Sequence, residues 1–544
     1  MKSILLIFAF IFISSLCFGD TYPKNPNIDV LHYTFRIELS DDTDEIKCEE
    51  TVDVRYLADG VEWLRLDLVK ASAALQNKGM RVSGVVSNGR AVVFTHENEE
   101  LKIKLPFASR ANERQQYTIT YAGTPASGLK IGNNKYGDRT FFSDNWPDKG
   151  RNWLAVVDHP HDKAACEFVV TAPAHYQVVS NGLRVEVSDV APGRRLTHWK
   201  QSVPIASWLY VLGVARFAMQ YVDEFDHKSI ETWVYYQDRE AGFKDFAEPT
   251  KKALAFYSDY IGPFAYKKLA NIQSNSVSGG MEAASAILYS EKSVVGDKNE
   301  RWRNVVIHEI AHQWFGNAVT EYDWDDVWLS EGFATYFTLL FIEHEYGHDA
   351  FMEGLASSKK RVDDFYAENP AYRIVHDNLS DMSKVTSSQT YQKGSWVLHM
   401  LRGVMGTDAF WKGIQTYYHK YQNLNATTVD FRREMEEASG LDLKQFFDQW
   451  LYQPGHLVYR GSWSYDKKTK EVNITLDQVQ TDGSLFKMPV QVGVFLPGQS
   501  RPVINTLQVN VKTNVFTLQF EVMPEKIVLD PHSWVLMESS FVKK

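Results

Sequence analysis

Two long stretches of alternating apolar and polar residues lie on either side of a central stretch with helical spacing. Period-two segments run from about residue 30 to 220 and again from 456 to 541, with turn sequences such as SNGR and APGR between them. Between about 248 and 452 the apolar residues follow the spacing of amphipathic helices. We therefore expect a multidomain α+β protein with an N-terminal antiparallel β domain (20–221, a sandwich or saddle), a mostly helical domain (222–455) and a C-terminal β-sandwich (456–544).

Length and composition agree with several folded domains. The 544 residues suggest three or four domains at about 150 residues each. Hydrophobic residues make up 44% and charged residues 23%, as in ordinary globular proteins. The formal net charge of −10 leaves no basic excess, so a nucleic-acid partner is not expected. Three cysteines are too few for a disulfide framework or a structural zinc finger.

The N-terminus has the pattern of a secretory signal peptide over residues 1–19. Lys2 precedes an apolar run from Ile4 to Ile13, and Cys17 and Gly19 occupy the −3 and −1 positions of a cleavage site before Asp20. The apolar run is short for a membrane span of about 20 residues. This pattern predicts an exported protein, either periplasmic or secreted.

The sequence leaves alternatives for membrane attachment and for the pairing of the cysteines. A lipoprotein signal would attach lipid to Cys17, but Leu16 stands where such signals usually have a small residue. No later stretch is apolar for long enough to cross a bilayer, so no stable span is expected after signal cleavage. Cys48 and Cys166 would remain in the mature chain, and the sequence leaves open whether they pair.

A metal-binding pattern lies inside one of the predicted helices. His308 and His312 are four residues apart, so they share a helix face and can reach one ion. Glu309 projects about 100° from His308, beside the ion rather than onto it, where a base for an activated water would lie. Roughly 0.06 such matches are expected by chance from the 16 histidines and 68 acidic residues. Ile310 and Trp314 mark the helix as mostly buried, and buried imidazoles need partners.

A third ligand is expected because catalytic zinc usually has three protein ligands and one open position. Glu331, 19 residues after His312, is the candidate, and we expect one Zn²⁺ ion per chain. Asp325 and Asp326 are candidate acceptors for the imidazole N–H groups, or else a solvated acidic loop. The ion would polarise a scissile carbonyl and lower the pKa of its water to about 7, and Glu309 would act as the general base.

With these motifs in place, the sequence resembles the aminopeptidase N family of gluzincin zinc peptidases, which also includes the bifunctional leukotriene hydrolases. The resemblance rests on the HExxH pattern, the 18-residue gap to the glutamate, and several flanking segments that occur in order along the chain. These segments are GGME (279–282), HQWFGN (312–317), WLSEGFATYF (328–337), YQKG (391–394) and VLHML (397–401), with looser matches in DHPHDKAACEFVVTAP and QWLYQPGH.

The resemblance implies a saddle-like β domain, a thermolysin-like catalytic domain and a β-sandwich. Many members of the family add a large C-terminal helical domain. This chain resembles a short form that lacks this domain, so any cap over the active site would be missing or supplied by another chain.

The resemblance also implies that Glu282 binds the free α-ammonium of the substrate, within a substrate-binding segment formed by Gly279, Gly280, Met281 and Glu282. A carboxylate at a fixed distance from the metal admits a chain end and rejects a chain interior. Glycines in this segment would let the substrate backbone approach closely. The family usually has Asn after this glutamate, whereas this chain has Ala283, so one expected polar contact is missing.

Two further roles follow from the resemblance. Tyr391 would donate a hydrogen bond to the developing oxyanion, while Lys393 and Gly394 would serve structure. Asp144 stands where the family often has Gln in the first side-chain pocket, so an acid there would favour basic N-terminal residues.

The expected function is that of a zinc aminopeptidase acting on peptides with a free N-terminus. One alternative is epoxide hydrolysis on a lipid, as in the leukotriene branch, which needs an apolar tunnel. A second alternative is a catalytically silent peptide-binding protein on the same scaffold, which the complete set of site residues disfavours. The sequence leaves the natural substrate and the oligomeric state open.

Overall fold

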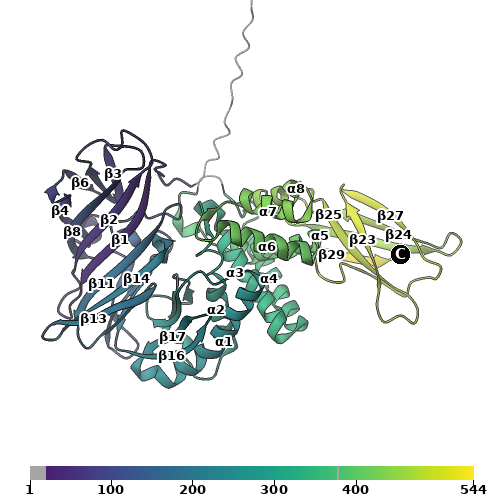
Figure 1. Ribbon diagram of the computed structural model, residues 1–544. Coiled ribbons are helices and arrows are strands. Elements are labelled where there is room, and N and C mark those ends of the chain that lie inside the picture. Colours follow the sequence, from purple (N-terminus) through teal and green to yellow (C-terminus); the bar gives the residue numbers. More distant parts are fainter. Residues whose placement is uncertain (1–19, 377–378) are drawn as a thin grey trace, which may run out of the picture.

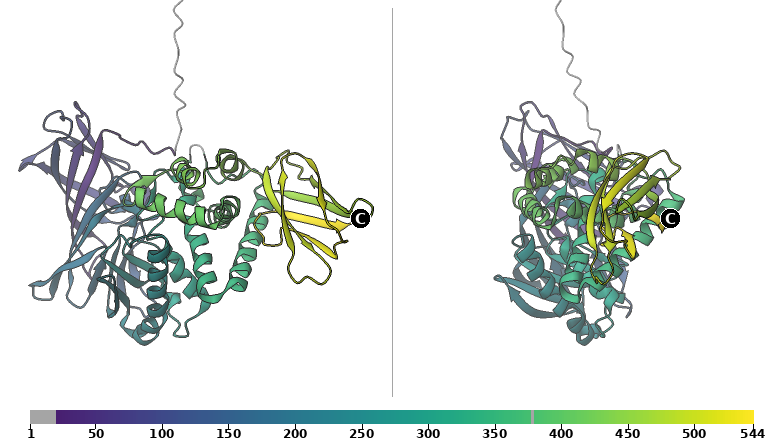
Figure 2. Two further views of the ribbon diagram at one scale, coloured as in Figure 1. Left: turned by 45° about the vertical axis from the view of Figure 1, so that its right-hand side comes forward. Right: turned by 90° about the vertical axis from the view of Figure 1, so that its right-hand side faces the viewer.

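A computed structural model describes residues 20–376 and 379–544 of the chain. The predicted signal segment and Cys17 therefore lie outside the described residues. Three regions follow one another in space as they do in sequence (Figures 1 and 2): a β region at one end, helices in the centre and a second β region at the other end. The predicted multidomain α+β class is confirmed.

The N-terminal region is built mainly from one large sheet and two smaller ones. The large sheet has the order β13-β14-β11-β1-β2-β8-β4-β5, and the smaller ones are β12-β15-β10-β9 and β3-β7-β6. Their strands are β1 (Ile28–Glu38), β2 (Ile46–Tyr56), β3 (Trp63–Asp67), β4 (Gly79–Ser87), β5 (Arg90–Ala91), β6 (Phe94–Glu97), β7 (Glu100–Lys104), β8 (Arg114–Thr124), β9 (Leu129–Asn133), β10 (Arg139–Ser143), β11 (Lys163–Pro173), β12 (Gln177–Ser180), β13 (Leu183–Ala191), β14 (Arg194–Ala206) and β15 (Leu212–Ala215).

Pairing in the large sheet is antiparallel except between β1 and β11, which run parallel. A period-two pattern carries no information on strand direction, and the long connection between these strands permits the parallel arrangement. Cys48 on β2 and Cys166 on β11 lie on opposite sides of β1. Two strand spacings amount to about 9.6 Å, beyond the reach of a disulfide, and both thiols are free and buried.

The central region combines a five-stranded sheet with the helices. The sheet order is β16-β17-β18-β20-β19, and the boundary expected after residue 221 falls inside β16. Its strands are β16 (Phe217–Phe225), β17 (Lys228–Tyr235), β18 (Lys268–Ser274), β19 (Gly280–Met281) and β20 (Ala286–Ser290), and a short pair is formed by β21 (Thr320–Glu321) and β22 (Asn425–Ala426). The helices are α1 (Arg239–Tyr260), α2 (Glu300–Ala311), α3 (Trp328–Tyr346), α4 (His348–Glu368), α5 (Gly394–Met405), α6 (Thr407–Tyr421), α7 (Thr428–Ser439) and α8 (Lys444–Phe447).

Helix ends follow local chemistry in most places. Gly347, at φ 92°, ends α3, because a positive φ suits glycine. Thr427 and Asp430 form a capping box at the start of α7. Helix α1 begins at Arg239, upstream of the stretch with helical spacing, and continues through Pro249. The residues before this proline are mostly helix formers, and they extend the helix upstream.

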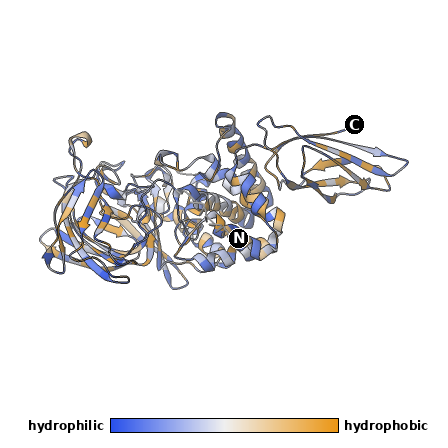
Figure 3. Cartoon of the chain, turned by 90° about the horizontal axis from the view of Figure 1, so that it is seen from above, coloured by the Kyte–Doolittle hydropathy of each residue, from blue (hydrophilic) through white to orange (hydrophobic). Residues whose placement is uncertain are grey.

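The C-terminal region is the predicted β-sandwich. Its two sheets have the orders β27-β24-β23-β29 and β26-β25-β28. The strands are β23 (Val458–Asp466), β24 (Glu471–Gln478), β25 (Met488–Phe495), β26 (Val503–Val509), β27 (Thr513–Gln519), β28 (Lys526–Leu529) and β29 (Glu538–Lys543). Figure 3 shows hydrophobic and hydrophilic residues alternating along them, as expected for strands with one buried face. Among the described residues, no helix is long and apolar enough to span a membrane.

Candidate active site

Two neighbouring helices in the centre of the molecule carry the predicted metal ligands (Figure 1). His308 and Glu309 lie in the last turn of α2, and His312 is its C-terminal cap residue. Glu331 lies in the first turn of α3. The loop between the helices therefore reverses the chain and brings a carboxylate to the imidazole pair.

The three ligand atoms have the spacing of a tetrahedral metal site. His308 Nε2 and His312 Nε2 lie 3.2 Å apart, and Glu331 Oε2 lies 3.3 Å from His312 Nε2 and 3.6 Å from His308 Nε2. Ligands at zinc distances of about 2.0–2.2 Å in a tetrahedron would be separated by about 3.4 Å. Glu331 Oε2 is buried and accepts no hydrogen bond, so the three residues fit a small divalent cation such as zinc.

The His312 ring is oriented for a metal by its other nitrogen. Nδ1 of His312 lies 3.1 Å from the carbonyl oxygen of Phe315 and 3.0 Å from the Ser330 hydroxyl. A carbonyl can only accept, so Nδ1 donates, which leaves the lone pair on Nε2 for a metal. The predicted aspartate acceptors do not fill this role at His312, since Asp326 accepts from Thr428 and Asp325 accepts from the Leu379 backbone. Both are buried, so they do not form a solvated loop either. Both aspartates secure the loop before α3 instead.

Three carboxyl groups converge on this site. Glu282, Glu309 and Glu331 are 5%, 6% and 4% exposed, and ligand atoms of Glu282, Glu309 and His312 lie within 4.8 Å of one another. Among the described residues, no lysine or arginine forms an ion pair with any of the three. Burying three carboxylates without positive partners is unfavourable, and a divalent metal together with a substrate ammonium would supply the missing positive charge.

Burial and neighbouring charges shift the titration of these groups. Burial raises the pKa of Glu282 to about 7, and burial together with the charge of Glu282 raises the pKa of Glu309 well above its usual value. At His312, burial favours the neutral ring, but the charges of Glu282 and Glu331 outweigh it and raise the pKa to about 10. Glu309 is therefore a stronger base than a carboxylate in water.

Glu282 follows the edge strand β19, and its backbone is held in place by two side chains of the loop after α2. The carbonyl of Glu282 accepts from Gln313 Nε2 at 3.0 Å and from Asn317 Nδ2 at 2.6 Å. Oε1 of Glu282 lies 4.0 Å from His312 Nδ1 and is buried without a hydrogen-bond donor. Ala283 is fully buried and offers no polar side-chain atom.

The two glycines before Glu282 differ in their surroundings. A Cβ on Gly280 would lie 2.2 Å from Glu309 Oε1, whereas a Cβ on Gly279 would have no atom within 4 Å. Gly280 therefore gives Glu309 its space, while Gly279 borders open space. Met281 is buried.

We expect Gly280→Ala to lower kcat by at least tenfold, because the methyl group displaces the Glu309 carboxylate. The matched change Gly279→Ala should act through substrate binding, so its effect should be on KM. Steady-state kinetics of both variants, with metal content as a check on folding, make the comparison. Equal kcat values for the two variants would contradict the steric role of Gly280.

Tyr391 lies beside the metal ligands, on a π-helical turn (Gln389–Lys393) that leads into α5. Its hydroxyl donates to Glu331 Oε1 at 2.7 Å. The turn approaches α3 closely, since a Cβ on Gly332 would lie 3.0 Å from Gly394 Cα and 3.1 Å from the Thr390 carbonyl oxygen. Gly394 thus has a packing role in bringing Tyr391 to the site, and Lys393 is buried.

Asp144 lies farther out, after β10, in a cavity of about 350 Å³ that is also lined by Gly128, Lys149 and Ser276. Its negative charge is one of the causes that raise the pKa of Glu282. Lys149 Nζ lies 3.4 Å from Asp144 Oδ2. The acid expected in a side-chain pocket is therefore partly balanced by Lys149.

Several supporting residues were missed by sequence reasoning. Lys163, at the start of β11, is half-buried and donates to the carbonyls of Asn317 and Ala318, each at 3.0 Å. It ties the N-terminal region to the loop between the metal helices. Ser330, Gln313 and Asn317 belong to the motifs HQWFGN and WLSEGF, so their place in those motifs was the available signal.

Two family models match the N-terminal and the central region of the chain. The Peptidase M1 N-terminal domain matches residues 30–209, and the Peptidase family M1 domain matches residues 246–450. The solved M1 zinc metallopeptidase from Deinococcus radiodurans has the same fold, with a TM-score of 0.67 and 24% identity over 78% of this chain and 93% of that chain.

Curated relatives include aminopeptidases. The glutamyl aminopeptidase of Mus musculus is 29% identical over 328 residues, which cover 58% of this chain and 35% of that protein. The tricorn protease-interacting factor F2 of Thermoplasma acidophilum is 26% identical over 517 residues, which cover 90% of this chain and 62% of that protein. The matched part thus spans about a third of the first relative and less than two thirds of the second. Because the two M1 domain matches together cover most of the described residues, the chain belongs to peptidase family M1.

Proposed function

We propose that this protein is a zinc-dependent aminopeptidase that hydrolyses the N-terminal peptide bond of peptides. The observation that carries the proposal is the buried Glu282 carboxylate. Its Oε1 lacks a donor and lies 4.0 Å from the imidazole of His312. An anion fixed beside a metal site and left without a partner suits the α-ammonium of a substrate, and it excludes chain interiors, which carry no such charge.

His308, His312 and Glu331 would hold the zinc ion, with the spacing described above. When bound, zinc supplies Lewis-acid chemistry, polarising a carbonyl and acidifying water. The single-helix origin of both imidazoles keeps their separation constant, because α2 is a rigid element.

Glu309 would take the proton from the attacking water and later deliver it to the leaving nitrogen. Its burial, and its raised pKa, suit a group that must both accept and donate a proton near neutral pH. Gly280 leaves the space that its carboxylate occupies beside the ligand pair.

Tyr391 would stabilise the oxyanion of the tetrahedral intermediate. Its phenol donates to a metal ligand, Glu331, so a small rotation would redirect this donor toward a substrate oxygen. Burial comes first among the causes that raise the pKa of Tyr391 well above its usual value, so its proton stays in place as a donor.

Substrate backbone would lie along β19. In the described part of the chain this strand pairs only with β20, so its outer edge is left for an extended peptide.

Asp144 would line the pocket for the first side chain, where Lys149 weakens its attraction for basic residues. An activity profile across N-terminal amino acids tests this: a Lys149→Met variant should gain preference for Arg and Lys, and an unchanged profile would rule out this pocket assignment.

The test of the aminopeptidase proposal is Glu282→Ala measured on matched free and Nα-acetylated substrates. We expect kcat/KM for the free aminoacyl arylamide to fall about 10²-fold, because a charge-assisted contact to the ammonium is lost. Acetylated substrate should be turned over poorly by both proteins. Dye release with and without chelator is the measurement.

Three outcomes would count against the proposal. Equal losses for free and blocked substrates would mean that Glu282 does not bind the ammonium. Full activity of the unmodified enzyme on blocked peptides would indicate an endopeptidase. A protein that binds zinc but releases no dye from any aminoacyl arylamide would favour the silent scaffold.

A further inference from the structure

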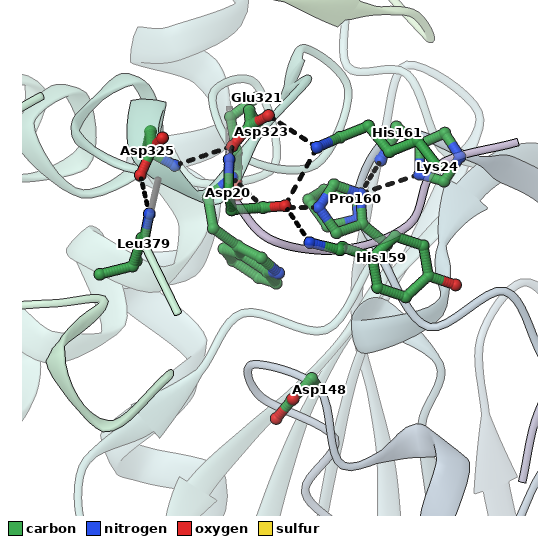
Figure 4. Close-up of polar contacts among 12 residues, drawn as sticks. Asp20, Lys24, Asp148, His159, Pro160, His161, Glu321, Asp323, Asp325 and Leu379 are labelled. Atoms are coloured by element: carbon green, nitrogen blue, oxygen red, sulfur yellow. Dashed lines mark hydrogen bonds and ion pairs between the residues drawn. The ribbon is translucent and has the colours of Figure 1, made fainter. Parts of the chain in front are cut away.

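The first described residues form a strap from the N-terminal β region to the catalytic region (Figure 4). The backbone nitrogen of Asp20 donates to Asp323 Oδ1 at 2.7 Å, and Thr21 N donates to the Leu379 carbonyl at 3.2 Å. Two residues on, the Tyr22 hydroxyl donates to Asp67 in the N-terminal region at 2.5 Å. The strap therefore touches both regions within three residues.

Asp20 itself is enclosed, at 8% exposure. Its Oδ2 lies 2.6 Å from His159 Nε2 and accepts from the Trp324 backbone at 3.1 Å. Asp323 and Trp324 belong to the short segment that leads into α3 and thus toward Glu331.

The charges around this contact are unbalanced. Among the described residues, Asp20 and Asp323 share one lysine, Lys24, whose Nζ lies 3.0 Å from Asp20 Oδ1 and 2.8 Å from Asp323 Oδ2. Burial lowers the pKa values of His159 and His161, the latter to about 3, so both rings are neutral near pH 7. A second positive charge at the position of the Asp20 nitrogen would balance the pair of carboxylates.

We propose that export cleaves the chain between Gly19 and Asp20, and that the new α-ammonium of Asp20 forms a buried ion pair with Asp323. The small residues Cys17 and Gly19 at the −3 and −1 positions match this cut. A signal peptidase of the exporting host would add one water across the bond. The Gly19 carbonyl carbon gains the oxygen and becomes a carboxylate, and the Asp20 nitrogen takes up two protons to become an ammonium group.

The consequence is that processing strengthens a contact that is already formed. An amide N–H is a neutral donor with a single hydrogen, whereas an ammonium is a charged donor with three. The atom that changes already lies 2.7 Å from its carboxylate partner, so little rearrangement is needed. The mature N-terminus would then hold the loop before α3 against the N-terminal region, independently of which reaction the site performs.

The first experiment identifies the N-terminus. The full chain is produced in a bacterial host that exports it, and the mature protein is analysed by intact mass and N-terminal sequencing. We expect a start at Asp20. A start at any other residue, including a lipid-modified Cys17, would overturn the proposal.

The second experiment measures protection of the amine. Protein starting at Asp20, released from a fusion partner without extra residues, is treated at neutral pH with an amine-reactive reagent, and the N-terminal peptide is quantified by mass spectrometry. We expect labelling to be at least tenfold slower than in Asp323→Asn. The control Asp297→Asn, at an exposed aspartate, should label as slowly as the unmodified protein. Equal rates for the unmodified protein and Asp323→Asn would refute the ion pair.

A third protein keeps the test decisive if Asp323→Asn does not fold. Adding back only Gly19 moves the ammonium one residue away and leaves every side chain unchanged. This extended protein should label rapidly and melt about 2 °C lower. If its Tm and labelling rate equal those of the protein that starts at Asp20, the docked ammonium does not exist.

Discussion

Replacing Glu309 by Gln is expected to reduce kcat by about 10²- to 10⁴-fold while the protein keeps its metal, which is the range for loss of a general base. The amide has almost the same size as the carboxylate, so the space beside Gly280 stays filled. It cannot accept the proton of water. Glu309 supplies none of the three ligand atoms that have tetrahedral spacing, so the variant should still bind the metal.

Steady-state kinetics and metal analysis of the same preparation check this result. Glu300→Gln is the matched control, because Glu300 lies at the exposed start of the same helix, and its kcat should be close to that of the unmodified enzyme. A near-normal kcat for Glu309→Gln would remove the base from the mechanism. Loss of metal in this variant would instead place Glu309 among the ligands.

Replacing His308 by Ala is expected to remove the metal and to lower kcat/KM by about 10³-fold or more, since the metal contributes several kcal/mol of transition-state stabilisation. His308 is the most exposed of the three ligands, with a side chain 20% exposed. Its replacement should therefore disturb the core less than replacement of His312.

Metal content after dialysis is the direct measurement, and it should fall from about one zinc per chain to near zero. A thermal shift gives a second readout: zinc should raise the Tm of the chelator-treated unmodified protein but not that of His308→Ala, because only a ligand that binds the folded state stabilises it. His344→Ala, at an exposed histidine of α3, is the control. Unchanged zinc content in His308→Ala would show that the ion is held elsewhere.

Local patterns predicted much of the fold. Sandwich strands such as β24 alternate because one face of each sheet is buried, as in Val472, Ile474 and Leu476. Gly347 ends α3 because glycine tolerates its positive φ. In each case neighbours in the sequence determine the outcome.

Some features could not be predicted because they depend on contacts with distant parts of the chain. Strand β18 is buried along its whole length, so it shows no alternation. It therefore falls within the stretch for which the sequence predicts helices. A proline favours the first turn of a helix, yet α1 starts ten residues before Pro249 and continues through it. Lys163 carried no sequence signal for its contact with Asn317, since the carbonyls that its ammonium group reaches come from a segment more than 150 residues away.

For the site, the sequence determined some of the residue positions and the tertiary structure determined the others. The pairing of His308 with His312 and the position of Glu309 beside them follow from the sequence alone, because helical geometry relates residues four apart whatever the rest of the chain does. The meeting of Glu282, Glu331 and Tyr391 at that pair, and of Asp20 with Asp323 across 303 residues, was decided by the packing of separate helices and strands. Such contacts depend on where whole elements settle against one another, and that position is a property of the complete core rather than of any segment.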